Sequence, residues 1–162
     1  MVMNLNNKKI LVTGGAGFVG SNIVTILLGM GAKVTVLDNL FTGSLKLLPN
    51  HDNLTFIKGD VSDDSLIDDL VQEFKLIIHA AAKNIIISTK NPYEDYETNI
   101  GATLKWLIAC KKYGVEKFVY TGSASVYGNP SIIPITESSS LYTLSPYAVS
   151  KLAGENYCTA FY

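Results

Sequence analysis

Three glycines at a spacing of three residues most constrain the fold of this chain. Gly14, Gly17 and Gly20 follow a β-branched apolar run at residues 10–12 and precede a helical pattern of apolar residues. Gly14 lets the chain turn sharply, Gly17 lets backbone N–H groups approach a bound pyrophosphate, and Gly20 lets the helix lie close on the strand. The pattern predicts a strand, a tight loop and a helix in direct succession.

The same alternation continues along the chain. Further strands are predicted at residues 33–38, 54–57, 76–79 and 117–120, and further helices at residues 62–73, at 92–113 and from Ser145 onward. Strands that alternate with helices imply right-handed crossovers. The expected fold class is therefore α/β, a doubly wound parallel sheet of five strands (Rossmann fold), with a long loop between Gly128 and Leu144.

In two of these helices, residues recur along one side at helical spacing. In the first helix the periodic residues are Val19, Ile23, Ile26, Leu27 and Met30. In the helix at 92–113 they are Tyr96, Ile100, Leu104, Leu107, Ile108 and Lys111. Trp106 lies away from this stripe and is expected to pack on a second copy of the chain. Ser62 is expected to cap the helix that follows the third strand.

Composition limits the class of protein. A chain of 162 residues is expected to form one compact unit, and its 48% hydrophobic content suits a sheet buried on both faces. All 13 basic residues are lysine against 14 acidic ones, so nucleic-acid binding is not expected. Cys110 and Cys158 are far apart and form no metal or redox motif, which favours a reducing, intracellular compartment.

The uncharged run at residues 10–32 follows Lys8 and Lys9 and could be mistaken for a signal peptide or a membrane span. Glycine, threonine, serine and asparagine interrupt it throughout. It therefore lacks the dense apolar centre of either, and no membrane association is expected.

Asp38 ends the second predicted strand, about 20 residues beyond the glycines, where a carboxylate can accept hydrogen bonds from an adenosine ribose. A carboxylate repels a 2′-phosphate, and the chain has no arginine to bind one, so NAD is favoured over NADP. The alternative is that the glycines serve only a turn and that Asp38 is merely exposed.

Tyr147 and Lys151 are four residues apart in the last predicted helix and therefore share a face. A neighbouring ammonium and a cationic nicotinamide both favour the phenolate, the form of tyrosine that can accept a hydroxyl proton. Without the other motifs, this pair would be read as two surface neighbours.

Taken together, these motifs resemble a known family. They are Thr-Gly-Gly-Ala-Gly-Phe-Val-Gly at 13–20, Asp38-Asn39, Gly59-Asp60-Val61, His79-Ala80-Ala81-Ala82, Thr98-Asn99, Ser-Ala-Ser-Val-Tyr-Gly at 123–128 and Tyr147-x-x-x-Lys151. The chain resembles the extended short-chain dehydrogenase/reductases, most nearly the NAD-dependent nucleotide-sugar epimerases and dehydratases of the UDP-glucose 4-epimerase kind.

The resemblance implies a set of site residues. Ser123, Tyr147 and Lys151 would be catalytic, and no metal is implied. Cofactor contacts would come from Gly14, Ala16, Gly17, Phe18, Val19, Asp38, Asn39, Asp60, Val61, Ala80, Ala81, Ala82, Asn99, Tyr147 and Lys151. In this set Asp60 and Val61 would flank the adenine, and Asn99 would steady the central helix. His79 is expected to be a structural residue at a strand end.

Within the family, epimerisation is the preferred reaction. Dehydratases carry an Asp-Glu pair after the catalytic hydroxyl residue, and here those positions are Ala124 and Ser125. A related dehydratase, reductase or decarboxylase stays open, as does a module that binds NAD without chemistry. Residues 1–162 would be the NAD-binding domain of a cytoplasmic homodimer acting on a UDP-sugar, with the C-terminal substrate-binding region absent.

Overall fold

The computed structural model describes residues 5–162, and this part of the chain divides into two compact units. The first, here called the sheet unit, comprises residues 5–81 and 105–121. The second, the helical unit, comprises residues 82–104 and 122–162. The sequence predicts a single compact unit. The structure differs because the segments of the helical unit pack mainly among themselves.

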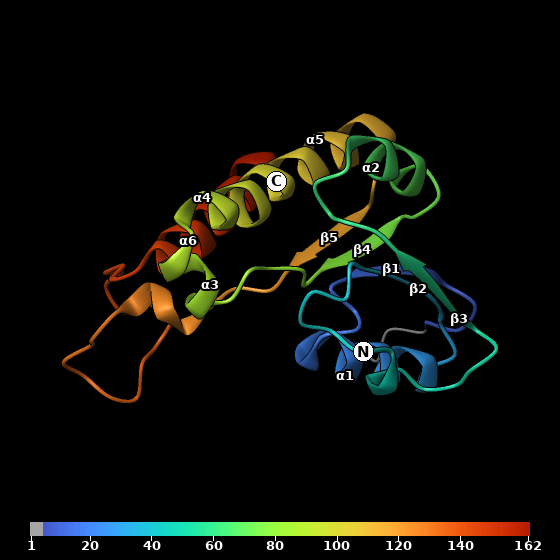
Figure 1. Ribbon diagram of the computed structural model, residues 1–162, viewed down its shortest axis with the longest axis horizontal. Helices are drawn as coiled ribbons and strands as arrows, with labels where there is room; N and C mark the ends of the chain where they lie inside the picture. The colour runs from blue at the N-terminus through green and yellow to red at the C-terminus, as the bar shows by residue number, and fades with distance from the viewer. Residues whose placement is uncertain (1–4) are drawn as a thin grey trace. The chain divides into compact units, whose positions relative to one another are not determined.

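The sheet unit is built on five parallel strands (Figure 1). They are β1 (Lys9–Thr13), β2 (Lys33–Asp38), β3 (Leu54–Lys58), β4 (Leu76–His79) and β5 (Lys117–Tyr120). Their order is β3-β2-β1-β4-β5, with every neighbouring pair parallel, which confirms the predicted fold class. Thr13 pairs with Leu37 on one side and His79 on the other, so the carboxyl ends of the central strands lie at one edge.

Helices cover both faces of this sheet (Figure 1). Helix α1 (Phe18–Gly29) lies on one face, where Val24 and Leu28 pack with the fully buried Ile10 and Val12 of β1. Helix α2 (Asp64–Val71) and the part of α5 (Thr103–Tyr113) from residue 105 lie on the other. A single turn of 3₁₀ helix, η1 (Leu45–Leu47), follows β2.

The apolar residues that recur at helical spacing along α1 are not all buried. Leu27 is buried, but Val19 and Ile26 are more than half exposed. The helix instead turns Gly20 and Ser21 inward. A Cβ at Gly20 would collide with the carbonyl oxygen of Gly14, so the closest approach between loop and helix decides which face is buried.

The predicted helix at 92–113 is helical throughout but is not one regular α-helix. It consists of α4 (Pro92–Asp95), a π-helical segment η2 (Tyr96–Ala102) and α5. A π-helical turn holds more residues than an α-helical turn, so an apolar stripe drawn at α spacing is displaced. Tyr96 and Ile108 are accordingly exposed, whereas Trp106 is fully buried, and its expected role in packing on a second copy is wrong.

The helical unit contains α3 (Ile85–Lys90), α4, η2, the 3₁₀ turn η3 (Ala124–Tyr127) and α6 (Pro146–Phe161). Helix α6 packs against the other four. Ser145 caps α6, as its hydroxyl oxygen accepts a hydrogen bond from the Ala148 N–H (3.1 Å), and Pro146 occupies the first turn. Residues 128–144 form neither helix nor strand, as predicted, whereas α3 was not predicted.

The structure also tests the predicted cap of α2 and the fold of the uncharged run at residues 10–32. Asp63, not Ser62, caps α2, because its carboxylate accepts hydrogen bonds from the N–H groups of Ser65 and Leu66. The uncharged run at residues 10–32 folds as most of β1, α1 and the turn that follows. Across residues 5–162, no helix combines the length and the apolar character that a membrane crossing needs.

Candidate functional site

The glycine loop after β1 has no room for side chains. Gly14 adopts a left-handed backbone conformation (φ +67°), and a Cβ there would lie 2.6 Å from the backbone nitrogen and Cα of Ala81. The Gly17 N–H donates to the Gly14 carbonyl oxygen (3.1 Å) and closes the turn. Glycine is therefore required at position 14 both for its conformation and for this close approach.

The N-terminal end of α1 is not capped by any side chain. Gly17 is the N-cap residue, and the first turn has no acidic residue. Phe18 and Val19 project outward, with exposed fractions of 81% and 56%. The partial positive charge of the helix end is thus available to an anion such as a pyrophosphate.

Asp38 is bound into this loop. Its side chain is buried, with one carboxylate oxygen accepting from the Ala16 N–H (3.0 Å) and the other from the Leu40 N–H (2.8 Å). A Cβ at Gly43 would lie 3.0 Å from both Ala16 and this carboxylate. The alternative in which Asp38 is merely exposed is therefore wrong. Asp38 joins the end of β2 to the glycine loop.

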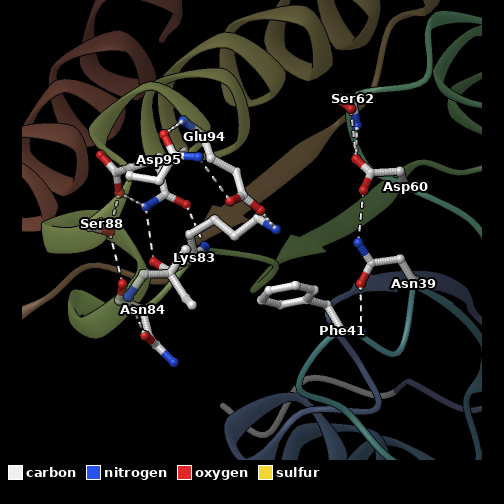
Figure 2. Close-up of polar contacts among 12 residues, drawn as sticks. Asn39, Phe41, Asp60, Ser62, Lys83, Asn84, Ser88, Glu94 and Asp95 are labelled. Carbon is white, nitrogen blue, oxygen red and sulfur yellow. Dashed lines mark hydrogen bonds and ion pairs between the residues drawn. The ribbon is translucent and has the colours of Figure 1, made fainter.

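Asn39 and Asp60 connect the ends of β2 and β3 (Figure 2). The Asn39 amide donates to one oxygen of Asp60 (2.7 Å), while its carbonyl oxygen accepts from the Phe41 N–H (2.9 Å). The other Asp60 oxygen accepts from the Ser62 N–H (2.9 Å) and hydroxyl (2.7 Å). The two residues predicted to contact the cofactor thus hold each other in place.

Trp106 fixes the next residue of that loop. Its indole N–H donates to the carbonyl oxygen of Val61 (2.9 Å). Lys105 adds a hydrogen bond to the Ser62 carbonyl oxygen (3.1 Å) and an ion pair with Asp64. Sequence reasoning missed both contacts, because they join residues more than 40 positions apart.

His79 has a structural position, as predicted. It is fully buried, and its Nδ1 lies 2.9 Å from the Thr13 hydroxyl. The backbone of β1 also holds the segment after β4: the Ala80 N–H donates to the Thr13 carbonyl oxygen (3.1 Å) and the Ala81 N–H to the Thr13 hydroxyl oxygen (3.3 Å). Ala82, the next residue, begins the helical unit.

The three predicted catalytic residues all lie in the helical unit. Ser123 caps η3, with its hydroxyl 2.9 Å from that of Ser125. Tyr147 and Lys151 lie one turn apart on α6. Tyr147 is partly exposed and Lys151 is buried. Their catalytic roles stay predictions.

Lys151 has a strongly perturbed pKa. Burial lowers the pKa of its ammonium from 10.5 to about 8, against the opposing effects of Glu155, Cys158 and Asp95. Burial also raises the pKa of the Cys158 thiol. Lys151 therefore titrates closer to neutral pH than an exposed lysine, a property typical of functional sites.

A cluster of buried polar side chains surrounds this face of α6. Asn99 accepts a hydrogen bond from the Lys83 N–H (2.7 Å), and its amide lies 2.5 Å from Asp95 and 3.2 Å from the Ser150 hydroxyl. Figure 2 shows Lys83, paired with Glu94, in the same group of contacts. Only Asn99 was singled out from the sequence. The one available signal for Asp95 is that it precedes Asn99 by four residues.

Between residues 5 and 162, no group of three or more histidine, cysteine, aspartate or glutamate side chains is arranged to hold a metal ion. What the described residues do offer is the glycine loop with its uncapped helix in one unit and the Tyr147–Lys151 pair in the other.

Comparison with known proteins decides the family. The family model described as the NAD dependent epimerase/dehydratase family matches residues 10–162. The chain belongs to this family. The UDP-glucose 4-epimerase of Haemophilus influenzae is 42% identical over 151 residues, which cover 88% of this chain and 45% of that protein.

Solved structures of this family agree. An epimerase of Methanothermobacter thermautotrophicus superimposes with a TM-score of 0.91 at 40% identity, covering 97% of this chain and 48% of that one. The UDP-glucose 4-epimerase of Thermus thermophilus, solved in complex with NAD, gives 0.86 at 38% identity, covering 94% and 50%. The chain thus spans about half the length of these family members.

Proposed function

We propose that this chain is the NAD-binding part of a nucleotide-sugar epimerase of the UDP-glucose 4-epimerase type. One observation carries the proposal: a glycine loop bound to a buried Asp38 occurs in the same chain as a buried Lys151 one helical turn from Tyr147. The similarity to UDP-glucose 4-epimerases supports it.

The residues of the sheet unit fit NAD. The uncapped end of α1 suits the pyrophosphate, and the free lone pairs of the Asp38 carboxylate suit the ribose hydroxyls. Asp60 and Val61 would flank the adenine, and Ala80 to Ala82 would pass beneath the cofactor. When bound, NAD supplies a hydride acceptor and donor for the sugar.

The residues of the helical unit fit the proton transfer. The Tyr147 phenolate oxygen would take the proton of the sugar 4-hydroxyl and return it after the keto-sugar has turned its other face. The Lys151 ammonium would favour the phenolate and bind the nicotinamide ribose, while the Ser123 hydroxyl would hydrogen-bond the reacting oxygen. The Asn99 amide would steady the central helix beside this pair.

The alternatives rank lower on specific observations. Elimination of water needs an acid and a base after Ser123, and Ala124 and Ser125 can supply neither. A non-catalytic NAD-binding module has no need of a buried Lys151 beside Tyr147. The expected homodimer and the cytoplasmic location stay predictions, and Trp106 no longer supports the dimer because it is buried.

The test uses the full-length protein, assayed for interconversion of UDP-glucose and UDP-galactose. Replacing Tyr147 by phenylalanine should lower the rate by about 10² to 10⁴-fold, the range for loss of a general base. Tyr157→Phe, on the same helix, is the matched control and should retain the rate. An undiminished rate in Tyr147→Phe would exclude the proposed role.

Two further measurements bear on this proposal. The 162-residue chain alone should show no meaningful turnover, because a sugar held by nothing else is not positioned for reaction. Calorimetry on the same chain should show tighter binding of NAD than of NADP. Asp38→Ala should reduce this difference in affinity. Equal affinities in the unmutated chain would contradict the assignment of NAD.

A further inference from the structure

The helical unit contains a buried carboxylate to which the proposed function gives no role. Asp95, the last residue of α4, is 2% exposed. One of its oxygens lies 2.5 Å from the Ser88 hydroxyl, 2.5 Å from the Asn99 amide and 3.0 Å from the Ser150 hydroxyl. These partners come from α3, η2 and α6, so a single carboxylate joins three helical segments to its own. Asp95 and Ser88 are labelled in Figure 2.

Such a group is expensive to bury, and it is tolerated only when it is hydrogen-bonded or paired with a charge. An apolar residue could fill the same volume at lower cost. The arrangement around Asp95 therefore contributes something other than packing energy. What it contributes is a directional contact, because a carboxylate oxygen holds its donors at defined distances and angles.

The contact with α6 is the informative one. Ser150 lies directly before Lys151 and three residues after Tyr147, and it is 1% exposed. Its hydroxyl lies 3.0 Å from Asp95 and 3.0 Å from the Tyr147 carbonyl oxygen. Residues three apart share a helix face, so Ser150 and Tyr147 lie on one side of α6, and Lys151 follows Ser150 on the same turn. Fixing Ser150 therefore fixes the rotation of α6 that sets the directions of the Tyr147 and Lys151 side chains.

Asp95 also acts on Lys151 through its charge. Electrostatic interactions with Glu155 and Cys158 on α6 and with Asp95 on α4 each raise the pKa of the Lys151 ammonium, in that order of size. Glu94, the neighbouring acid of α4, is instead paired with Lys83. Burial disfavours the ammonium, and the negative charges of Glu155 and Asp95 oppose that effect.

We propose that Asp95 is a positioning residue for the Tyr147–Lys151 pair: its buried carboxylate holds Ser150, fixes the rotation of the α6 turn that carries both side chains, and adds a negative charge to the surroundings of Lys151. The inference rests on the proposed function for the importance of the pair. The contact between Asp95 and Ser150 does not depend on the proposed function.

The first test needs no turnover. The ¹⁵Nζ resonance of Lys151, assigned by its loss in Lys151→Met, is titrated by NMR in the 162-residue chain and in Asp95→Asn. The variant should lower the measured pKa of Lys151, because it removes one of the negative charges that oppose the effect of burial. Glu97→Gln removes an exposed carboxylate two residues away and should leave the titration unchanged.

The second test is kinetic and uses the full-length protein. Asp95→Asn should lower kcat by about ten- to a hundredfold, the cost of a misdirected catalytic group, with KM for the UDP-sugar changed less than about twofold. Should Asp95→Asn fail to fold, Ser150→Ala decides the question, because it keeps the charge and removes the link. It should lower kcat by at least about threefold at an unchanged KM.

The outcomes separate the two proposals. If Tyr147→Phe abolishes turnover while Asp95→Asn leaves both the Lys151 titration and kcat unchanged, the positioning role is overturned and the function stands. If Asp95→Asn shifts the Lys151 titration while Tyr147→Phe reacts at full rate, the contact is real and the proposed function fails. If Asp95→Asn does not fold, an unchanged kcat in Ser150→Ala overturns the positioning role.

Discussion

The elements that carry the functional residues are held in place by different forces in the two units. In the sheet unit, the glycine loop and Asp38 lie at the ends of strands whose apolar residues, such as Ile10 and Val36, are fully buried. In the helical unit, Lys151 lies on a helix whose inner face contacts a buried polar cluster around Asp95. Apolar burial is non-directional and independent of pH. The polar cluster depends on every donor and on the charge of its members.

The largest effect is expected from crowding the glycine loop. Gly14→Ala introduces a Cβ 2.6 Å from the Ala81 backbone at a positive φ, so it should destabilise the sheet unit by about 2–5 kcal/mol and abolish NAD binding. Urea denaturation and calorimetry measure both quantities. Gly29→Ala is the control, since its Cβ meets nothing within 4 Å. Equal stability of the two variants would contradict the prediction, because it would mean that the loop backbone shifts to make room for the Cβ at position 14.

The next effect is confined to the helical unit and depends on pH. Lys151 has a pKa of about 8 when folded and 10.5 ordinarily, so between these values the unfolded chain binds more protons. The free energy of unfolding should therefore rise with pH from about 8 to 10.5, by about 1.4 kcal/mol per unit of pKa difference. Below pH 8 the buried side chain is charged, and its destabilising effect on the folded chain is fully present.

Lys151→Met isolates this contribution, because it removes the titration and leaves every tyrosine and cysteine in place. Urea denaturation of both proteins at pH 7.5 and pH 10 should show the wild-type chain gaining stability relative to the variant at the higher pH. A stability difference that is the same at both pH values would show that Lys151 does not titrate in this range.

The smallest effect compares two serine–aspartate contacts directly. The Ser88 hydroxyl lies 2.5 Å from the buried Asp95 in the helical unit, and the Ser65 hydroxyl lies 2.8 Å from the exposed Asp63 in the sheet unit. Ser88→Ala should cost about 1.5–3 kcal/mol, because it removes a donor from a buried charge. Ser65→Ala should cost less than about 0.5 kcal/mol, because water replaces the hydroxyl. Thermal denaturation at pH 7 measures the two costs, and equal values would remove the distinction between the units.

Much of the fold was predictable from the sequence. The five strands, the glycine loop and the start of α6 at Ser145 all depend on residues close together in the chain. The faces of the helices were predicted less well. Val19 and Ile26 belong to the periodic apolar set of α1 but are exposed, because the close contact between Gly20 and the Gly14 carbonyl turns the smaller residues of α1 inward.

The candidate site divides in the same way. Asp38 was predictable because a carboxylate at the end of a second strand follows a glycine loop by a regular interval. Asp95 was not, because its meaning depends on Ser150, which is 55 residues away, and on the packing of α6. Trp106 was misjudged because the π-helical segment before it changes which side chains share a face.

The sequence by itself determined the order of strands and helices, the turn at Gly14 and the pairing of Tyr147 with Lys151 on one helical turn. Each of these depends on backbone preferences and on spacings of a few residues. The tertiary structure alone decided that Lys151 is buried and that Asp95 lies among three donors. Burial and the energy of a charge depend on what other segments bring to the same place, and no local pattern records that.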